Sequence, residues 1–427
     1  MIRIRCCVLG TALAAALATT SAVAQLPLVP RALGLGGAYI GLARGQESLF
    51  LNPANLGLAD GPRWSVAFPQ VTVGGTLRGQ TISDVRDLIG YDDLNQQERD
   101  ELLAGIPQDG IALEGDVRAP FAAFQSGNFA VGVAYTVTGE HGVSRDVVEL
   151  FVDGFDPSRR DYTVSGTEGR RASYLDFAAG YGRSVGPLSL GATGHYYLGR
   201  ALSRTRAFDP SYTDIIIDRD IRVEYVGVAS EGGSGFGLDL GAALQPAPGV
   251  TLSASVANVL SSFSWDEELV GRSVTLNRDN FRSDFELVYS DYKRSDRSLG
   301  ATPTGRFAEV AEGIFDNAEP PTTLRIGAGW SLPSGTGLSA AYHTNLSEGT
   351  LAGRWESLAA VGVQQRILFF TARVGASTNL EDGSLLGGGI TLGPVDVGVA
   401  RLSGEGSDGT EREGWIASFG LSARPRR

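Results

Sequence analysis

The feature that most constrains the fold of this chain is a period-two alternation of apolar residues with small or polar ones, repeated in many short segments. In the clearest segment, 128–139, the apolar positions are Phe129, Val131, Val133, Tyr135 and Val137. Similar segments lie at 188–198, 236–244 and 415–422. Because successive side chains of a β-strand point to opposite faces of a sheet, each segment predicts a strand with one apolar face.

The connections between these segments alternate strictly between short and long. The tight joints lie at 126–128, 185–187, 247–249, 333–335, 364–366 and 393–394. The long connections cover 77–110, 140–171, 201–233, 260–321, 345–353, 377–384 and 403–412. A soluble sandwich gives no reason for this alternation, whereas an outer-membrane barrel has short periplasmic turns and long extracellular loops. We therefore predict an all-β fold, a transmembrane antiparallel up-and-down β-barrel.

The number of predicted strands is even, which places both chain ends on the periplasmic side. About 14 strands are expected, as in barrels of this type: 63–76, 111–125, 128–139, 172–184, 187–200, 234–246, 249–259, 323–332, 336–344, 354–364, 367–376, 385–392, 394–402 and 413–423. Segments 221–228 and 281–289 also alternate, and we interpret them as extensions or hairpins within extracellular loops. A sixteen-strand barrel is the alternative. The alternation slips at Pro69 in the first strand, which predicts a bulge there.

The first 24 residues have the pattern of a secretory signal peptide. Two arginines precede an apolar run, and Ala22-Val23-Ala24 supplies an A-x-A cleavage site. A retained membrane anchor is the alternative. Both cysteines of the chain, Cys6 and Cys7, lie in this segment, so the expected mature protein has none. Thiol catalysis, zinc fingers and disulfide scaffolds are therefore excluded.

Composition excludes further classes of protein. Hydrophobic residues make up 42% of the chain, mean hydropathy is −0.01 and the formal net charge is −12. No segment of the expected mature chain approaches the roughly 18 consecutive apolar residues of a spanning helix. An acidic chain is a poor partner for the phosphate backbone of nucleic acid, so we expect no nucleic-acid binding.

A glycine-rich stretch precedes the first predicted strand and reads RALGLGGAYIGLARGQESLFLNPANLGLADG from Arg31. It resembles the N-terminal plug, or hatch, of the fatty-acid transporter-like (FadL-like) outer-membrane barrels, with an uncharacterised branch suggested by the segment 100–110. The matching positions are Arg31, Gly36, Gly37, Ala38, Asn52, Pro53 and Ala54. Glycines allow a plug backbone to pack closely inside a narrow lumen, and Asn-Pro fixes a turn.

The resemblance implies an organisation and a function. The expected regions are a signal peptide at 1–24, a plug at 25–62 and a barrel at 63–427, with a helical insertion near 81–107. By this resemblance, plug displacement would let small hydrophobic, fatty-acid-like molecules cross the outer membrane of a Gram-negative-type bacterium. Outer-membrane lipid, a hydrophobic ligand and the barrel-assembly machinery are the implied partners. The competing hypothesis is a non-transporting adaptor or scaffold barrel that binds a secreted or surface protein.

Several charged residues fall on the polar faces of the predicted strands. They are Asp116, Arg118, Asp176, Asp239, Arg325, Arg373 and Asp396. A lipid-facing Arg costs about 2–4 kcal/mol at the bilayer midplane, so we expect all of them to line the lumen. Pairing across the interior is the favoured role, and ligand binding is the alternative.

Motifs for chemistry are scarce. His141, His195 and His343 are far apart in sequence, and without cysteines they predict no metal site. The run from Gly34 to Gly41 lacks the Lys-Ser/Thr of a phosphate loop. The acids 266–268 and Asp279 match no calcium-loop spacing. We therefore expect no enzyme activity and no cofactor. The amphipathic segment 83–107 predicts a helix, which could act as a lid over the lumen or pack on the rim.

Overall fold

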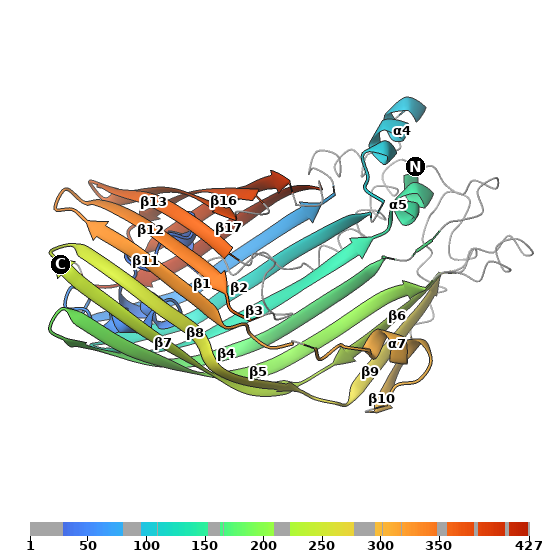
Figure 1. Cartoon of the computed structure of the whole chain (residues 1–427), viewed down its shortest axis with the longest axis horizontal. Coiled ribbons are helices and arrows are strands. Elements are labelled where there is room, and N and C mark those ends of the chain that lie inside the picture. The colour runs from blue at the N-terminus through green and yellow to red at the C-terminus, as the bar shows by residue number, and fades with distance from the viewer. Residues whose placement is uncertain are drawn as a thin grey trace, which may run out of the picture.

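The wall of the protein is a closed antiparallel β-barrel (Figure 1). The computed structural model describes residues 29–79, 95–108, 110–152, 163–164, 166–208, 223–276, 295–300, 302–316, 318–347, 357–379, 383–405 and 410–425. All strands of this part belong to one 17-stranded sheet. The last strand pairs with the first over Val66–Ala423 to Arg78–Arg412, which closes the wall.

Fourteen of the seventeen strands form the closed wall. They are β1 (Trp64–Arg78), β2 (Ile111–Ser126), β3 (Phe129–Val143), β4 (Glu168–Val185), β5 (Leu188–Phe208), β7 (Gly233–Ala247), β8 (Val250–Trp265), β11 (Thr323–Ser331), β12 (Thr336–Asn345), β13 (Ser357–Ile367), β14 (Phe370–Asn379), β15 (Gly383–Leu392), β16 (Val395–Glu405) and β17 (Glu411–Ala423). The predicted fold, a fourteen-strand up-and-down barrel, is confirmed.

Three further strands extend one side of the wall beyond the barrel. They are β6 (Val223–Ser230), β9 (Leu269–Leu276) and β10 (Ser295–Gly300). β6 pairs with the C-terminal part of β5, from Leu202 to Phe208. β9 pairs with β6, and β10 pairs with β9. Of the segment 221–228, the described residues 223–228 belong to an extension, as expected, and the sixteen-strand alternative is wrong. β9 and β10 were not predicted, and segment 281–289 lies outside the described residues.

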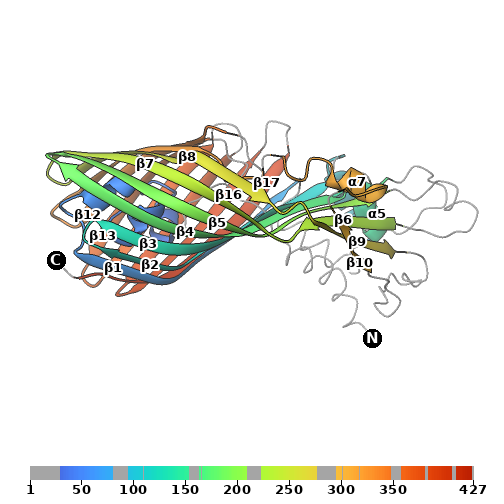
Figure 2. The same ribbon diagram turned by 90° about the horizontal axis from the view of Figure 1, so that it is seen from below.

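The wall has a tall side and a short side (Figures 1 and 2). β4 and β5 on the tall side have 18 and 21 residues, whereas β11 and β12 on the short side have 9 and 10. At about 3.3 Å per residue, the tall side rises far above the short one. The extension β6–β9–β10 adds to the tall side, because it grows from β5.

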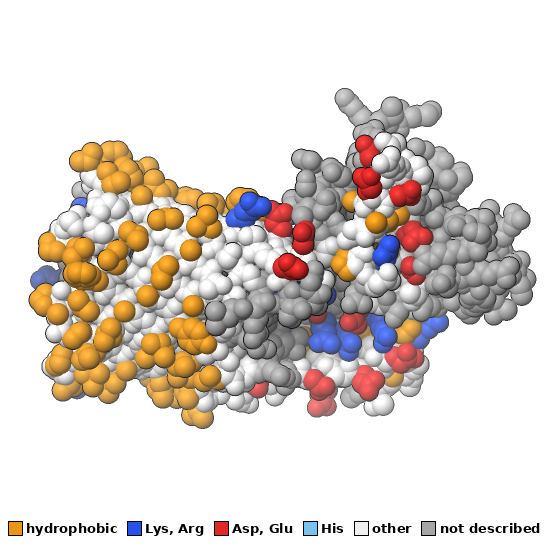
Figure 3. All heavy atoms as spheres, turned by 45° about the horizontal axis from the view of Figure 1, so that its top comes forward, with side chains coloured by type: hydrophobic (Ala, Val, Ile, Leu, Met, Phe, Trp, Pro, Cys, Tyr) orange, Lys and Arg blue, Asp and Glu red, His pale blue; other side chains and the backbone are white. Residues whose placement is uncertain are grey.

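The outer face of the barrel carries the apolar residues of the alternation. Large side chains exposed there include Phe68, Tyr181, Phe236, Leu260, Val361, Leu386 and Trp415. Figure 3 shows hydrophobic side chains spread over one end of the molecule, whereas most charged side chains gather at the other end. An apolar band of this kind is the surface that a lipid-facing barrel wall requires.

The register of β1 confirms the predicted bulge. Pairing with β17 shifts between Ala67 and Gln70, on either side of Pro69. Proline cannot donate a ladder hydrogen bond, so the strand bends at this residue. The pairing of β7 with β8 also contains a register shift: Leu238 pairs with Leu260, but Leu240 pairs with Val256.

Helices lie beyond the wall, on the side of the long loops (Figure 1). They are α4 (Gln96–Ala104), α5 (Arg145–Val152) and α7 (Arg306–Ala311). Leu103 and Ile106, in and just after α4, pack with Val148 of α5. The described contacts of α4 are therefore those of a rim helix, and residues 81–94 of the predicted helical region are outside the described part. Among the described residues, no helix has the length and apolarity needed to cross a membrane.

A charge on the outer band tests its contact with lipid. Val361 in β13 is 60% exposed and lies between Ala340 and Ala376 of the neighbouring strands. Val361→Arg is expected to lower the free energy of unfolding by about 2–4 kcal/mol, because the guanidinium would lie in hydrocarbon. Urea unfolding in lipid bilayers measures this change. Val361→Ile is the control, and an unchanged stability of Val361→Arg would contradict a lipid-facing wall.

Candidate functional site

The N-terminal segment fills the barrel at the end farthest from the loop helices (Figures 1 and 2). It contains α2 (Pro30–Leu33), η1 (Gly45–Phe50) and η2 (Pro53–Gly57). Between residues 29 and 58, Leu42, Arg44 and Gly57 are partly exposed and all other residues are buried. We call residues 29–58 the plug.

Glycines allow the plug to touch the wall with its backbone. Gly36 and Gly37 have φ values of 61° and 99°, a left-handed region that favours glycine. On the wall, a Cβ added to Gly375 of β14 would lie 2.0 Å from the carbonyl carbon of Leu35. Plug and wall are therefore in backbone contact, and neither surface has room for a methyl group at this point.

The Asn-Pro-Ala motif forms a turn and also fastens the plug to the wall. The Asn52 Oδ1 accepts a hydrogen bond of 3.0 Å from the Ala54 N–H, which caps η2. The Asn52 Nδ2 donates to the Ala242 carbonyl of β7 at 3.1 Å. Pro53 begins η2, where its fixed φ suits a first helical position. One residue thus caps the turn and bonds the barrel.

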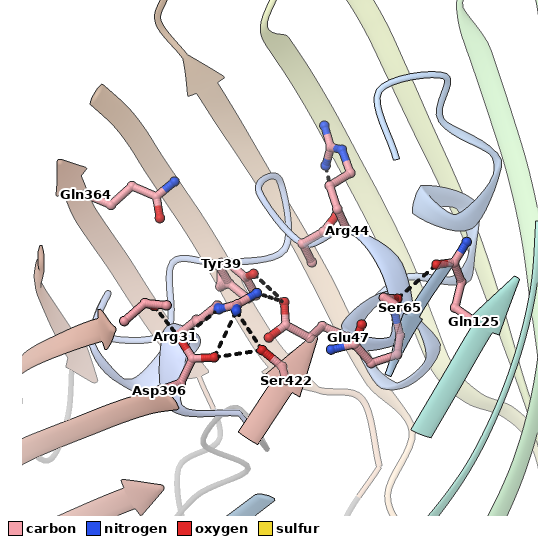
Figure 4. Close-up of polar contacts among 12 residues, drawn as sticks. Arg31, Tyr39, Arg44, Glu47, Ser65, Gln125, Gln364, Asp396 and Ser422 are labelled. Carbon is pink, nitrogen blue, oxygen red and sulfur yellow. Dashed lines mark hydrogen bonds and ion pairs between the residues drawn. The ribbon is translucent and has the colours of Figure 1, made fainter. Parts of the chain in front are cut away.

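Arg31 joins the plug to the short side of the wall (Figure 4). Its Nε and Nη2 donate to the two carboxylate oxygens of Asp396 in β16 at 3.0 and 2.8 Å. The Nη2 also donates to the Ser422 Oγ of β17 at 2.8 Å. Arg31 is 4% exposed and Asp396 is 1% exposed. Two-pronged pairing of this kind is the strong geometry for an arginine and a carboxylate.

A second carboxylate and a second arginine complete this network. The Arg31 Nη1 lies 3.3 Å from the Glu47 Oε2, to which the Tyr39 hydroxyl donates at 2.5 Å. Burial and the negative charge of Glu47 raise the pKa of the Tyr39 hydroxyl, so it stays protonated and able to donate. The Arg373 Nη1 lies 3.9 Å from Asp396. Two guanidiniums and two carboxylates therefore balance inside the barrel, and we call them the Arg31 network.

The tall side of the wall holds the plug with hydroxyl groups instead. Plug carbonyls accept hydrogen bonds from the side chains of Ser184, Ser189, Thr193 and Ser255, at 2.6, 2.6, 3.1 and 2.8 Å respectively. Each such bond contributes about 0.5–1.5 kcal/mol net. The carbonyls of a non-regular segment inside a barrel need these partners, because an unpaired buried carbonyl is costly. The plug is thus held on both sides.

A layer of charged side chains lies directly above the plug. Arg325 of β11 donates to the Phe50 carbonyl of the plug at 3.4 Å. The ring nitrogens of His195 lie 2.9 Å from Asp176 and 3.3 Å from Asp239. These three residues belong to β5, β4 and β7, which are adjacent in the wall. Thr193, two residues before His195 on the same face, contacts the plug.

Asp116 and Arg118 of β2 belong to the same layer. The Arg118 Nε lies 3.6 Å from the Asp116 Oδ2. Arg118 is also near enough to Arg325 for the two positive charges to repel each other. The full set is Asp116, Arg118, Asp176, His195, Asp239 and Arg325, which we call the charged layer. The charged layer and the Arg31 network both lie inside the wall, at different heights.

Aromatic rings follow above the charged layer. His195 stacks on Tyr197 with ring centroids 5.7 Å apart, and Tyr197 lies 6.0 Å from Phe263. Phe263 in turn lies 4.9 Å from Trp265, whose indole N–H donates to the Ala318 carbonyl. Tyr174 meets Tyr197 edge to face at 5.8 Å. We call Tyr174, Tyr197, Phe263 and Trp265 the aromatic row.

The structure divides the predicted site residues between these groups. Arg31 and Arg373 meet in the Arg31 network, while Arg118, Asp176, Asp239 and Arg325 belong to the charged layer. The remaining plug positions, Gly36, Gly37, Ala38, Asn52, Pro53 and Ala54, are all buried. Sequence reasoning missed Glu47, Tyr39 and the bridging role of His195. A signal existed for Glu47, since it is a charged residue within an apolar plug.

Removing the plug arginine tests the Arg31 network. Arg31→Ala leaves Asp396 and Glu47 buried without their partner, and breaking a buried pair costs about 3–5 kcal/mol. Denaturant unfolding in detergent measures the change. Arg401→Ala removes a comparable arginine from an exposed pair with Glu413 and is expected to cost no more than about 1 kcal/mol. Equal losses for the two variants would contradict the role of Arg31.

Glycines of the wall allow a second test of plug contact. Gly375→Ala places a methyl group against Leu35 and is expected to destabilise the protein by about 1–3 kcal/mol through overpacking. Gly388→Ala in the next strand is the matched control, since the nearest atom to its added Cβ is 3.9 Å away. Thermal unfolding followed by circular dichroism compares them. A Gly375→Ala protein as stable as the control would show that the plug does not press on β14.

Solved structures with the same fold include those of two toluene transporters, one of them also as a mutant. The toluene transporter TbuX of Ralstonia pickettii has a TM-score of 0.53 and 15% identity, over 94% of this chain and 100% of that one. The P. putida toluene transporter TodX has a TM-score of 0.52 and 12% identity, over 93% and 99%. The deltaS2S3 mutant of TodX, described as a monoaromatic hydrocarbon channel, has a TM-score of 0.56 and 12% identity, over 93% and 99%.

No protein-family model and no curated protein sequence matches the chain. At 12–15% identity, the likeness to TbuX and TodX concerns the fold. The fold expected from the resemblance to the FadL-like barrels is thereby confirmed over nearly the whole chain. The protein therefore shares its fold with TbuX and TodX, and its own wall has fourteen strands with the N-terminal segment inside.

Proposed function

We propose that this protein is an outer-membrane channel that passes small hydrophobic molecules across the membrane, with the plug as its gate. The observation that carries the proposal is the position of the plug. It fills the barrel at one end, and the charged layer and then the aromatic row, which packs with Phe307 and Val310 of α7, lie between the plug and the long loops. A molecule that enters beneath the loops would meet these side chains first and the plug last.

The outer surface and the structural neighbours support the same proposal. The apolar band would contact outer-membrane lipid, and the barrel-assembly machinery would insert the strands. TbuX and TodX are described as toluene transporters, so a small aromatic hydrocarbon or a fatty-acid-like molecule is the first cargo to test. In this mechanism, residues 36–52 of the plug shift and the ligand continues through the lumen or through the wall.

Weakening the hydroxyl bonds that hold the plug tests the gate. Ser189→Ala/Thr193→Val removes the donors to the Ala54 and Leu49 carbonyls, so the plug is expected to shift more readily and uptake of labelled toluene by intact cells to rise. Ser262→Ala, at an exposed serine of β8, is the control. Uptake by the double variant no higher than that of the control would contradict a gate held by these bonds.

A second function, that of a non-transporting adaptor, is favoured by one observation. The lumen is occupied by the plug and charged side chains, which suits a scaffold as well as a gated channel. Under this alternative, the long loops and the acidic helix α4 would bind a secreted or surface protein. Mild-detergent purification from native membranes, followed by mass spectrometry, separates the two functions. A stoichiometric small apolar molecule supports transport, whereas a persistent protein partner with bulk phospholipid alone supports the adaptor.

A further inference from the structure

The end of the barrel that holds the plug carries an excess of positive charge. The strand ends and tight turns at this end cover 59–64, 125–129, 183–188, 245–250, 332–336, 365–370, 392–395 and 422–425. Their only acidic residue is Asp60, which forms a two-pronged pair with Arg44 at 2.8 and 2.9 Å. Four exposed arginines remain, and we call them the arginine rim: Arg63, Arg183, Arg366 and Arg424. None of the four forms an ion pair with another described residue.

This excess is opposite in sign to the charge of the whole chain, whose formal net charge is −12. In Figure 3, basic side chains mark the end covered by hydrophobic residues, and acidic ones lie toward the other end. Unpaired basic groups gathered at one end of a protein create a positive potential there. A surface that binds this end is therefore expected to carry negative charge.

Strongly exposed apolar side chains lie in the same turns as the arginines. Val185 is 73% exposed, Leu368 is 84% exposed and Phe369 is 74% exposed. Leaving side chains of this size in water forgoes the free energy of their burial. At the boundary of a bilayer, where apolar and aromatic residues of barrels meet the headgroups, lipid would cover them. The turns are therefore suited to the bilayer boundary and not to the water beyond it.

Arg183 shows how an arginine of the rim would meet this boundary. It follows Tyr181 on the outer face of β4 and lies opposite Leu190 of β5, and these two neighbours are 52% and 56% exposed. Two residues along a strand span about 7 Å, so the long side chain of Arg183 can lie along apolar surface while its guanidinium reaches the headgroups. A guanidinium can donate two parallel hydrogen bonds to one phosphate. The arginine and its apolar neighbours thus match the two parts of a phospholipid.

We infer that the arginine rim and the apolar turns beside it form a docking surface for anionic phospholipids of the periplasmic leaflet. A zwitterionic headgroup also has a phosphate, but its amine cancels the charge, so the rim prefers headgroups with a net negative charge. The inference concerns how the barrel is held in its membrane, and it applies to a channel and to an adaptor alike. A soluble anion is a poor substitute, because it leaves Val185, Leu368 and Phe369 uncovered.

A competition between two lipids tests the inference with the purified full-length mature protein in detergent. Phosphatidylglycerol and phosphatidylcholine with the same acyl chains are supplied in equal amounts, and native mass spectrometry counts the molecules of each that stay bound. Phosphatidylglycerol is expected to be retained about tenfold more often, and added salt is expected to weaken the preference. Equal retention of the two lipids would overturn the inference. Displacement of phosphatidylglycerol by an equal concentration of glycerol 3-phosphate would also overturn it, because the rim would then bind a soluble anion.

Paired variants locate the preference. Arg183→Gln/Arg366→Gln keeps hydrogen-bonding side chains but removes half of the rim charge, so the preference is expected to fall about threefold. Arg272→Gln/Arg401→Gln makes the same change in charge on the side of the long loops, where both arginines pair with glutamates, and is expected to keep the full preference. Circular dichroism verifies folding of both variants. An equal loss in the two would show that overall charge sets the preference, which would overturn the role of the arginine rim.

A third variant tests the apolar turns. Leu368→Asn/Phe369→Ser removes two exposed apolar side chains and leaves every charge in place. Fewer molecules of both lipids are expected to stay bound, at an unchanged ratio, because the turn contacts the lipid body and the arginines select the headgroup. Unchanged retention of both lipids would overturn the role of this turn in the docking surface.

Discussion

The closure of β1 on β17 is the constraint from which the rest of the structure follows. A strand in hydrocarbon cannot leave its peptide groups unpaired, so the sheet must return to its first strand. Closure creates an interior, and at fourteen strands that interior is wide enough to hold a segment of chain. The plug brings its own peptide groups inside, which then need partners. The serines and threonines of β4, β5 and β8 meet that need, and wall glycines such as Gly375 make the close approach feasible.

The two sides of the wall hold the plug by different physical means. On the short side, the Arg31 network joins the plug to β14, β16 and β17 through ions buried almost completely. On the tall side, neutral hydroxyls donate to carbonyls of residues 49–57. Buried ion pairs depend strictly on both partners, whereas a hydroxyl bond can be exchanged for water at little cost. Residues of η2 can therefore move with a smaller loss of free energy than α2 or η1, since Glu47 of η1 belongs to the Arg31 network.

Sequence periodicity was sufficient for the wall and insufficient for its interior. Alternation around Phe129 and the slip at Pro69 depend on neighbours in sequence, so strand positions and the bulge were predictable. The plug could be located because its glycines and Asn52 are required by the local backbone conformation: Gly36 and Gly37 have positive φ values and Asn52 caps η2. The Arg31–Asp396 pair joins residues 365 positions apart. The His195 bridge depends on registers that place Tyr197 opposite Asp176 and Thr193 opposite Asp239. Neither register can be read from one strand alone.

Because one side of the wall is taller than the other, the two sides of the molecule differ within the plane of a membrane. Strands of about 9–11 residues are just long enough to cross a bilayer, so β11–β16 set the depth of immersion. The longer strands then rise as a screen on one flank, and the opposite flank is left low. A neighbouring lipopolysaccharide or protein molecule on the tall side would be separated from the barrel mouth by the long strands. A neighbour on the short side would not. Neighbouring molecules would therefore affect access to the extracellular opening of the barrel mainly when they lie on its short side.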